Sequence, residues 1–519
     1  MMEHTQPEQN ALGGWRIHEV GPEGRPLAGR LAERCGAFLG PLLKQLDQTL
    51  DKRLVRTVAN VVTALVRHRN RPQALLLSEL GGMLAGPEHA PAGTKRLGNL
   101  LHSPRWEAAT VEDSLLEQGR AVVQSEAVRV AEGRALCILD GSVLEKPESV
   151  AAEGLSPVRS SKARRLARPR PKQGKGYYRG KPGGPIVVPG FSWAGVLVTG
   201  WAAVAERRPV ALGAWHWYSK PLTEDASATR QETAAESTPA DGAAAAATGE
   251  RVPRQRLHEA EWAVLERVVS AWDPNQLLHV WDRGMSGAPW LGQALDRGWR
   301  FVVRWKKGNR LRPATAPSIG DPEATPAQRE RDGKAAWRLT AGLRAWGQRQ
   351  VPNPRSPKQS LTVSFAARPV CLMGRDDPLW LVVARVGSRA TRRGGKEPWR
   401  LLTTEPVITE EQCWRMVEAY VARWHIEQML RFGKSELGIE SVRVRNWEPR
   451  HKLLALAGLA YAFLVDLLGD CTALILPPLL RWAHRTGWQA NHAWRCLYRL
   501  RAALTALWNT HTPSFHAPP

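Results

Sequence analysis

Two short apolar runs, far apart in the chain, each end in an aspartate. They are Ala135–Asp140 and Leu277–Asp282, and a glycine follows each acid within two residues. Apolar runs of this length bounded by turn residues are typical of buried strands. Ligands are usually met at the ends of strands in an α/β sheet, so Asp140 and Asp282 are candidate functional residues. For either acid taken alone, a turn or capping role is the alternative interpretation.

Strand-like and helical segments alternate around these two runs. Residues 256–272 repeat apolar side chains at helical spacing, whereas residues 187–199, 209–218 and 299–305 have the Val- and Trp-rich character of strands. This alternation predicts an α/β core, with an antiparallel part between residues 187 and 218.

Changes in pattern divide the chain into parts. Residues 30–125 repeat apolar side chains at helical spacing and predict a helical N-terminal domain with a DNA-binding role. Its segment from Thr94 carries Lys95, Arg96, Asn99 and His102, which suit either a helix lying on DNA or a solvated helix face. The full division is a flexible N-terminus over 1–29, the helical domain over 30–125, an α/β domain over 130–305 and 406–470 that contains a low-complexity loop at 222–250, a β-rich insertion over 306–405, and a C-terminal helical segment over 471–519.

The charge of the chain points to a polyanion as partner. Lys and Arg number 73 against 49 Asp and Glu, a net charge of +24. Nucleic acid is the commonest polyanion that a protein meets, although an anionic membrane surface would also attract this charge. Residues 159–181 concentrate ten Lys or Arg with no acid, which suits a phosphate backbone or a solvated loop.

Several classes of protein are excluded or disfavoured. The longest apolar run, Leu453 to Val465, is too short to span a membrane and predicts a buried helix, and no secretory signal is visible. The six cysteines include no C-x-x-C pair, which argues against a zinc ribbon and suits a reducing compartment such as the cytoplasm. A DNA-binding chain there would be expected to associate with the nucleoid. P-loop, H-E-x-x-H and G-x-S-x-G motifs are absent, which leaves chemistry run by carboxylates.

A third acid, Glu427, lies on a long helix predicted from about Thr409 to Lys434. Tyr420, Arg423, Glu427 and Lys434 fall within an arc of about 60° at about 100° per residue, spread over about 21 Å of helix axis. One carboxylate is therefore flanked by two cations and a phenol that suit DNA phosphates. A structural Arg–Glu pair at i, i+4 on an exposed face is the alternative. Three converging acids would hold two Mg²⁺ ions for phosphoryl transfer.

These residues resemble a known family. Asp140-Gly-Ser, Trp281-Asp282-Arg-Gly and the Y-(2)-R-(3)-E-(6)-K spacing from Tyr420 to Lys434 are similar to the catalytic regions of insertion-sequence DDE transposases. The four-point helix motif is specific, whereas D-G-S or D-R-G alone is weak. The resemblance covers roughly residues 136–454. It implies an RNase H-like mixed sheet flanked by helices, with a β-rich insertion before the glutamate.

The resemblance also implies roles for individual residues. Asp140, Asp282 and Glu427 would be catalytic residues and the ligands of two Mg²⁺ ions, with Mn²⁺ as a possible substitute. The residues expected to hold DNA are Tyr420, Arg423, Lys434, Arg283 and Arg304. The substrate would be double-stranded DNA, at the element's ends and at a target, bound by a homodimer with no membrane involved.

Two features depart from the family pattern or its usual dimensions. Gly-Ser follows Asp140 where many relatives have hydroxyl residues, and Asp140 and Asp282 are 142 positions apart, which is long for this fold. Two other functions stay open: a catalytically inactive, transposase-derived DNA-binding protein, and a nuclease that does not transfer strands.

Overall fold

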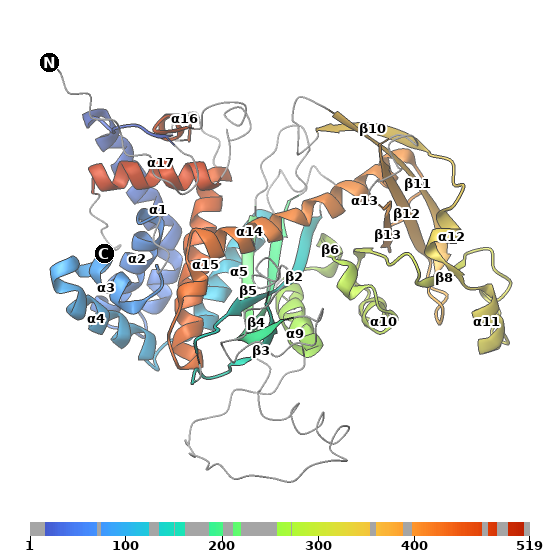
Figure 1. Cartoon of the computed structure of the whole chain (residues 1–519), viewed down its shortest axis with the longest axis horizontal. Helices are drawn as coiled ribbons and strands as arrows, with labels where there is room; N and C mark the ends of the chain where they lie inside the picture. Colours follow the sequence, from blue (N-terminus) through green and yellow to red (C-terminus); the bar gives the residue numbers. More distant parts are fainter. Residues whose placement is uncertain are drawn as a thin grey trace, which may run out of the picture.

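The computed structural model places a bundle of helices at one end, a mixed sheet in the middle and a β-rich insertion at the other end (Figure 1). It describes residues 16–69, 74–123, 134–149, 151–160, 186–200, 211–218, 257–270, 272–352, 360–387, 397–469, 476–484 and 497–512. The tract at 222–250 and residues 161–181 of the basic segment lie outside these ranges.

The N-terminal helices pack around two helices from the other end of the chain. They are α1 (Arg25–Leu46), α2 (Lys52–Arg67), α3 (Leu77–Ala85), α4 (Ala90–His102) and α5 (Ala108–Val123). Their apolar faces share one core with α15 (Trp447–Gly469) and α17 (Leu497–Thr510). The helical N-terminal part is therefore completed by C-terminal residues.

The expected boundary at residue 30 needs correction. Helix α1 begins at Arg25, and strand β1 (Arg16–Ile17) pairs antiparallel with β14 (Ala483–His484). Within the stretch expected to be flexible, residues 16–17 and 22–29 therefore form regular structure. Pairing across more than 450 positions leaves no local signal in the sequence, which is why the pattern did not reveal it.

Helix α15 is the buried helix expected around residues 453–465. Among the described residues, Trp447–Leu468 is the one helical stretch long and apolar enough to cross a membrane, and 83% of its most apolar window is buried inside the protein. Its apolar character therefore serves the core shared by the N-terminal and C-terminal helices.

The central sheet is mixed. Its strands are β2 (Ala135–Glu145), β4 (Val187–Thr199), β5 (Ala211–Tyr218), β6 (Leu277–Trp281) and β7 (Phe301–Arg304). They lie in the order β5-β4-β2-β6-β7, antiparallel from β5 to β2 and parallel from β2 to β7, and β3 (Ser156–Arg159) pairs with the start of β4. Helices α9 (Leu257–Ser270) and α10 (Ala288–Asp296) lie on one face. The predicted RNase H-like α/β fold is confirmed.

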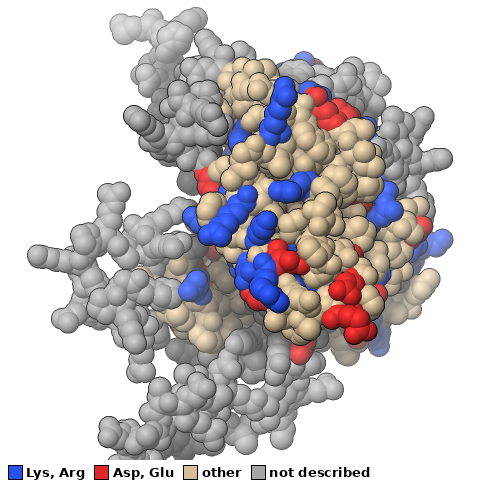
Figure 2. Space-filling view, turned by 90° about the vertical axis from the view of Figure 1, so that its right-hand side faces the viewer, with Lys and Arg blue, Asp and Glu red and all other residues tan. Residues whose placement is uncertain are grey.

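The insertion continues this sheet. Its strands are β8 (Arg310–Pro313), β9 (Lys334–Ala335), β10 (Gly347–Pro352), β11 (Ser360–Cys371), β12 (Leu379–Val386) and β13 (Trp399–Thr403), with α11 (Pro326–Asp332) and α12 (Ala336–Thr340) between them. Strand β13 pairs antiparallel with β7, so the insertion extends the central sheet edge to edge. Seen from this end, Lys and Arg lie in a band on one side while Asp and Glu gather at the lower right (Figure 2).

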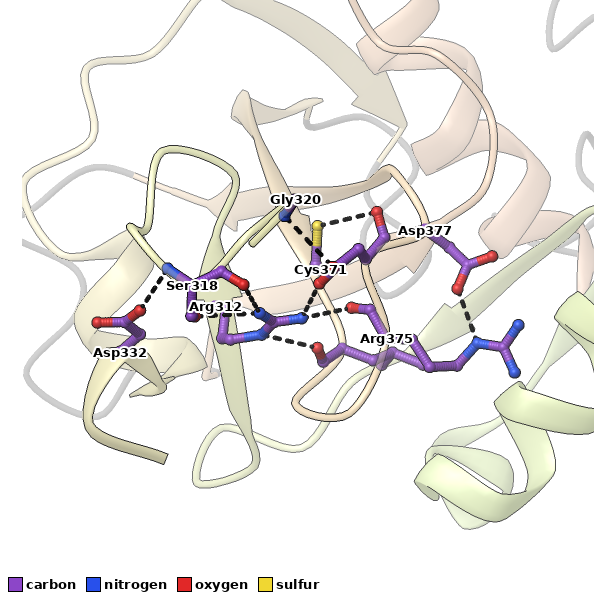
Figure 3. A network of polar contacts seen from close by, with 9 residues as sticks. Arg312, Ser318, Gly320, Asp332, Cys371, Arg375 and Asp377 are labelled. Carbon is purple, nitrogen blue, oxygen red and sulfur yellow. Dashed lines mark hydrogen bonds and ion pairs between the residues drawn. The ribbon is translucent and has the colours of Figure 1, made fainter. Parts of the chain in front are cut away.

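A fully buried arginine fixes the far end of the insertion. Arg312 donates to the carbonyls of Ser318 at 3.1 Å and Arg375 at 2.7 Å and pairs with Asp376 (Figure 3). Arg375 in turn pairs with Asp296 of α10 at 2.6 Å. Because a buried guanidinium is costly unless its donors are satisfied, this network holds the β11–β12 turn in one place against the core.

Candidate active site

Asp140, Asp282 and Arg304 stand at one level across three adjacent strands. The last parallel pair of β2 and β6 is Ile138 with Val280, and each aspartate lies two residues beyond it. The pair Val280–Val302 between β6 and β7 puts Arg304 at that same level. Parallel register therefore brings together two acids that are 142 positions apart in the sequence.

Strand periodicity also puts these side chains on one face. Successive residues of a strand point to opposite faces, so Asp140 shares its side with Leu136 and Ile138. The side chains of Leu136 and Ile138 belong to the core formed with α13 (Glu410–Ala422), α14 (Trp424–Ser435) and α15. Leu278 and Val280 precede Asp282 at the same parity and belong to that core as well. The acids thus face α13 and α14, away from α9 and α10.

The long helix predicted from Thr409 to Lys434 is in fact two helices that meet at Arg423. Thr409 begins α13 with a capping box formed with Gln412. Arg423 keeps helical dihedrals (φ −51°, ψ −28°), but its N–H donates to the Tyr420 carbonyl three residues back at 3.2 Å. The chain tightens there, so Tyr420 lies on α13 whereas Glu427 and Lys434 lie on α14.

Arg423 joins two of the three acids. Its guanidinium donates to Asp140 at 3.1 Å and pairs with Glu427 one helical turn further on. The Arg–Glu pair at i, i+4 is therefore present, as the alternative interpretation expected. It is not on an exposed face, since the side chains of Arg423 and Glu427 are 16% and 29% exposed and Asp140 from β2 completes the group.

Asp140 is held in an environment that disfavours its charge. The pKa of Asp140 is raised to about 6, mainly by burial and also by the charges of Asp282 and Glu427, while Arg423 and the Gly141 N–H lower it in part. The influence of Asp282 and Glu427 shows that the three acids lie close enough for their charges to interact. A cation beside these like charges would favour the ionised form of Asp140.

Asp282 has a local structural role as well. Its carboxylate accepts a hydrogen bond from the Gly284 N–H at 2.5 Å and begins the short helix η4 (Arg283–Met285). A Cβ at Gly284 would lie 2.8 Å from the Asp282 carboxylate, so the glycine makes room for it. The capping interpretation is thus correct for Asp282, and the cap also fixes where its carboxylate points.

Tyr420 connects the acids to Arg304. Burial raises the pKa of its phenol, while Arg423 and a hydrogen bond with Arg304 act in the opposite direction. Its ring packs edge-on against Trp399 of β13 with centroids 5.4 Å apart, so the insertion supports the tyrosine. Tyr420, Arg423 and Arg304 therefore form one group beside the acids.

Lys434 points toward the strand that carries Asp140. Its ammonium donates to the Val143 carbonyl at 2.8 Å and lies 3.8 Å from Glu440. In this structure the lysine therefore supports the end of β2, three residues beyond Asp140.

A basic cavity of about 440 Å³ opens beside this group. Its lining residues are Arg283, Arg304, Trp305, Lys306, Lys307, Gly308, Asn309, Glu397, Pro398 and Arg400. Five cations face a single acid, so the cavity suits an anion. Arg283 and Arg304 were expected to bind DNA, whereas Lys306, Lys307 and Arg400 were missed. The basic run after residue 304 was a signal for the two lysines, but Arg400 joins them only through the β13–β7 pairing.

The acids suit a divalent cation by their chemistry. In the ranges that the structure describes, no three or more His, Cys, Asp or Glu side chains converge closely enough to hold a metal ion as they stand. Asp140, Asp282 and Glu427 nonetheless supply the hard oxygen ligands that Mg²⁺ prefers. The charges of Asp282 and Glu427 raise the pKa of Asp140, and a bound cation would counteract this effect. In this structure the guanidinium of Arg423 fills that role between two of them.

Comparison with known proteins bears on most of this site. Residues 258–463 match the family model described as the transposase DDE domain. The matched region contains Asp282, Glu427 and the whole insertion, while Asp140 lies before it. No curated protein matches the chain.

Proposed function

From the premise that this chain is a DDE transposase, we propose that Asp140, Asp282 and Glu427 cut DNA at the ends of an insertion sequence and join the freed 3′-OH ends to target DNA. Metal-dependent DNA cleavage and transposition are the general activities of the family. The observation that carries the assignment of the acids is their shared place, with two of them level on parallel strands and the third facing them from α14.

The three carboxylates are proposed to hold the metal. When bound, two Mg²⁺ ions, or Mn²⁺ in their place, would supply Lewis-acid activation of the attacking and leaving oxygens. The protein's own contribution is orientation: register fixes Asp140, the η4 cap fixes Asp282, and the α13–α14 turn fixes Glu427.

The cleaved strand is proposed to lie over Tyr420, Arg423 and Arg304 and into the basic cavity. Arginine offers a planar fork and tyrosine a hydroxyl to a phosphate oxygen. Lys306 and Arg283 are exposed at the cavity and add charge for neighbouring phosphates. This arrangement would hold a phosphodiester of the cleaved DNA strand next to the acids.

Duplex recognition is proposed for the helical N-terminal domain. Helices α3 and α4 pack so closely that a Cβ at Gly93 would lie 2.1 Å from the Gly81 carbonyl oxygen, and Gly86 with φ +90° turns the chain between them. This helix–turn–helix leaves one face of α4 exposed, with the side chains Lys95, Arg96, Asn99 and His102. These residue types bind phosphates and base edges, so α4 suits the end sequence of the element. Two copies of the chain on paired ends would form the homodimer.

A strand-transfer assay separates this proposal from its two competitors. The substrate would be a duplex with an element end already cut to a 3′-OH, supplied with a circular target and Mg²⁺. We expect joined product from the wild-type chain and none from Glu427→Gln. Cut ends without joined product would favour a nuclease, and binding of the duplex with neither reaction would favour a DNA-binding remnant.

A further inference from the structure

Arg423 occupies the space that a metal ion would share with two of its ligands. The guanidinium reaches Asp140 on β2 at 3.1 Å and Glu427 on α14, and its side chain is only 16% exposed. The pair with Asp140 joins residues 283 positions apart in the chain. An arginine so placed offsets part of the negative charge of the acids while no other cation is present.

We propose that Arg423 is the counter-ion of the DNA-free site and leaves it for a DNA phosphate, so that metal binding and DNA binding are coupled. This inference rests on the proposed function, because it takes the three acids as metal ligands. It adds a regulatory step: without DNA the acids are occupied by the protein's own cation, and with DNA they are released to the metal.

Charge accounts for the first half of the coupling. Asp140 and Glu427 carry two negative charges in a partly buried place, and Arg423 offsets one of them through hydrogen bonds as well as charge. A divalent cation approaching the same oxygens meets a positive guanidinium and must displace it. The affinity of the free protein for metal is therefore lowered by the presence of Arg423.

Geometry accounts for the second half. The Arg423 guanidinium carbon lies 5.9 Å from the centroid of the Tyr420 ring, and Arg304, which lines the basic cavity, is near enough to Tyr420 for its charge to lower the pKa of the phenol. A phosphate held by Arg304 and the cavity would thus lie beside Tyr420, the ring that Arg423 already approaches. Guanidinium binds phosphate through two parallel hydrogen bonds, so it gains as good a partner as it gives up. By linkage, metal must then tighten DNA binding by the same factor.

The direct test is the binding of Mn²⁺, measured from the paramagnetic resonance of the free ion, to the full chain without DNA. We expect Arg423→Gln, which keeps most of the side-chain volume, to bind Mn²⁺ about tenfold more tightly than the wild type, within the range usual for coupled sites. Arg431→Ala is the control, since Arg431 is an exposed arginine of α14, the helix that follows Arg423, and its guanidinium lies over the Trp424 ring. It should bind Mn²⁺ as the wild type does.

A second measurement needs no substitution. Mn²⁺ binding to the wild-type chain would be repeated with a duplex that carries a precut element end and no target, so that no further reaction occurs. We expect DNA to tighten Mn²⁺ binding about tenfold in the wild type and to leave Arg423→Gln nearly unchanged. Equal Mn²⁺ affinities in the wild type and in Arg423→Gln, with no effect of DNA, would overturn the coupling.

These outcomes are distinct from failure of the proposed function. If the acids are not metal ligands, Glu427→Gln binds Mn²⁺ as the wild type does and the chain does not cut DNA. If only the coupling is wrong, Glu427→Gln loses Mn²⁺ binding and cleavage while Arg423→Gln leaves Mn²⁺ affinity unaltered.

Discussion

Asp140 and Asp282 stand level with each other, each two residues past the last rung of the parallel β2–β6 ladder. The family match begins after Asp140, so the register of the sheet is the independent support for placing this residue with the other two acids. Because side chains alternate between the two faces of a strand, both carboxylates lie on the sheet face covered by α13 and α14, and Glu427 lies on α14.

Replacing Asp140 by asparagine should stabilise the DNA-free protein at neutral pH. Folding raises the pKa of Asp140 to about 6 from an unfolded value near 3.8, so the folded state holds the extra proton between these values. The free energy of unfolding therefore falls as pH rises from about 4 to 6, and the ionised carboxyl remains destabilising above pH 6. We expect Asp140→Asn to raise the free energy of unfolding by about 1 to 3 kcal/mol at pH 7.5.

Denaturant unfolding at pH 7.5 and pH 5 checks this prediction. The gain of Asp140→Asn should shrink at pH 5, where the wild-type carboxyl is largely protonated. Asp47→Asn, an exposed acid after α1, serves as the control and should change little. A less stable Asp140→Asn at both pH values would mean that the pair with Arg423 outweighs the burial and the like charges.

His279 should make the protein sensitive to acid. The residue is fully buried in β6, stacked on Trp299 at 4.7 Å, and neither ring nitrogen has a hydrogen-bond partner among the described residues. Burial lowers the pKa of His279 to about 3, so the unfolded chain takes up a proton below about pH 6.5 that the folded chain refuses. Stability is complete above that pH and is lost as pH falls toward 3.

Unfolding of His279→Phe against pH tests this account. A phenyl ring fits the aromatic stack and does not titrate, so the loss of stability between pH 7 and pH 5 should be smaller by about 2 kcal/mol than in the wild type. An unchanged slope would show that other groups govern the acid sensitivity.

Gly284→Ala should impair cleavage without unfolding the protein. The new Cβ would lie 2.8 Å from the Asp282 carboxylate and force it to move. A misplaced ligand or positioning group commonly costs about 10²-fold in rate. Gly374→Ala in the insertion, where a Cβ meets nothing within 4 Å, is the matched control. Equal cleavage rates in the two variants would remove Asp282 from the proposed chemistry.

Lys306→Ala should weaken DNA binding and lower its dependence on salt. The lysine is exposed at the basic cavity, and each phosphate contact contributes about −0.9 to the slope of log affinity against log salt. Fluorescence anisotropy with a labelled duplex, taken from low to moderate salt, would measure both changes. Lys334→Ala, an exposed lysine of β9 outside the cavity, should keep the wild-type slope.

The sequence was sufficient for the features that repeat locally. Apolar runs ending in an acid predicted β6 and the first part of β2, and the expected β-rich insertion contains β11, β12 and β13. Asp282 follows the end of β6 as expected, but the expectation that Asp140 ends its strand was wrong, because β2 continues through Asp140 to Glu145 by pairing with β4. The register and side-chain direction that bring the acids together appear only in the structure.

Features made by distant pairing were out of reach. The contact of Lys434 with the Val143 carbonyl and the entry of Arg400 into the basic cavity depend on which elements meet in space. Likewise, α15 and α17 complete the core of the N-terminal helices. Periodicity shows which face of an element is apolar, not which partner will cover it.

The most direct test of the account is cleavage of DNA that carries the element's own ends, with Mg²⁺ and with EDTA, by the wild-type chain and by Glu427→Gln, Asp140→Asn and Arg431→Ala. We predict cuts at the ends that require metal, are lost in Glu427→Gln and Asp140→Asn, and persist in Arg431→Ala. Cutting by Glu427→Gln or Asp140→Asn at the wild-type rate, or bound DNA left uncut by the wild type with Mg²⁺, would contradict the assignment of these acids as the catalytic centre.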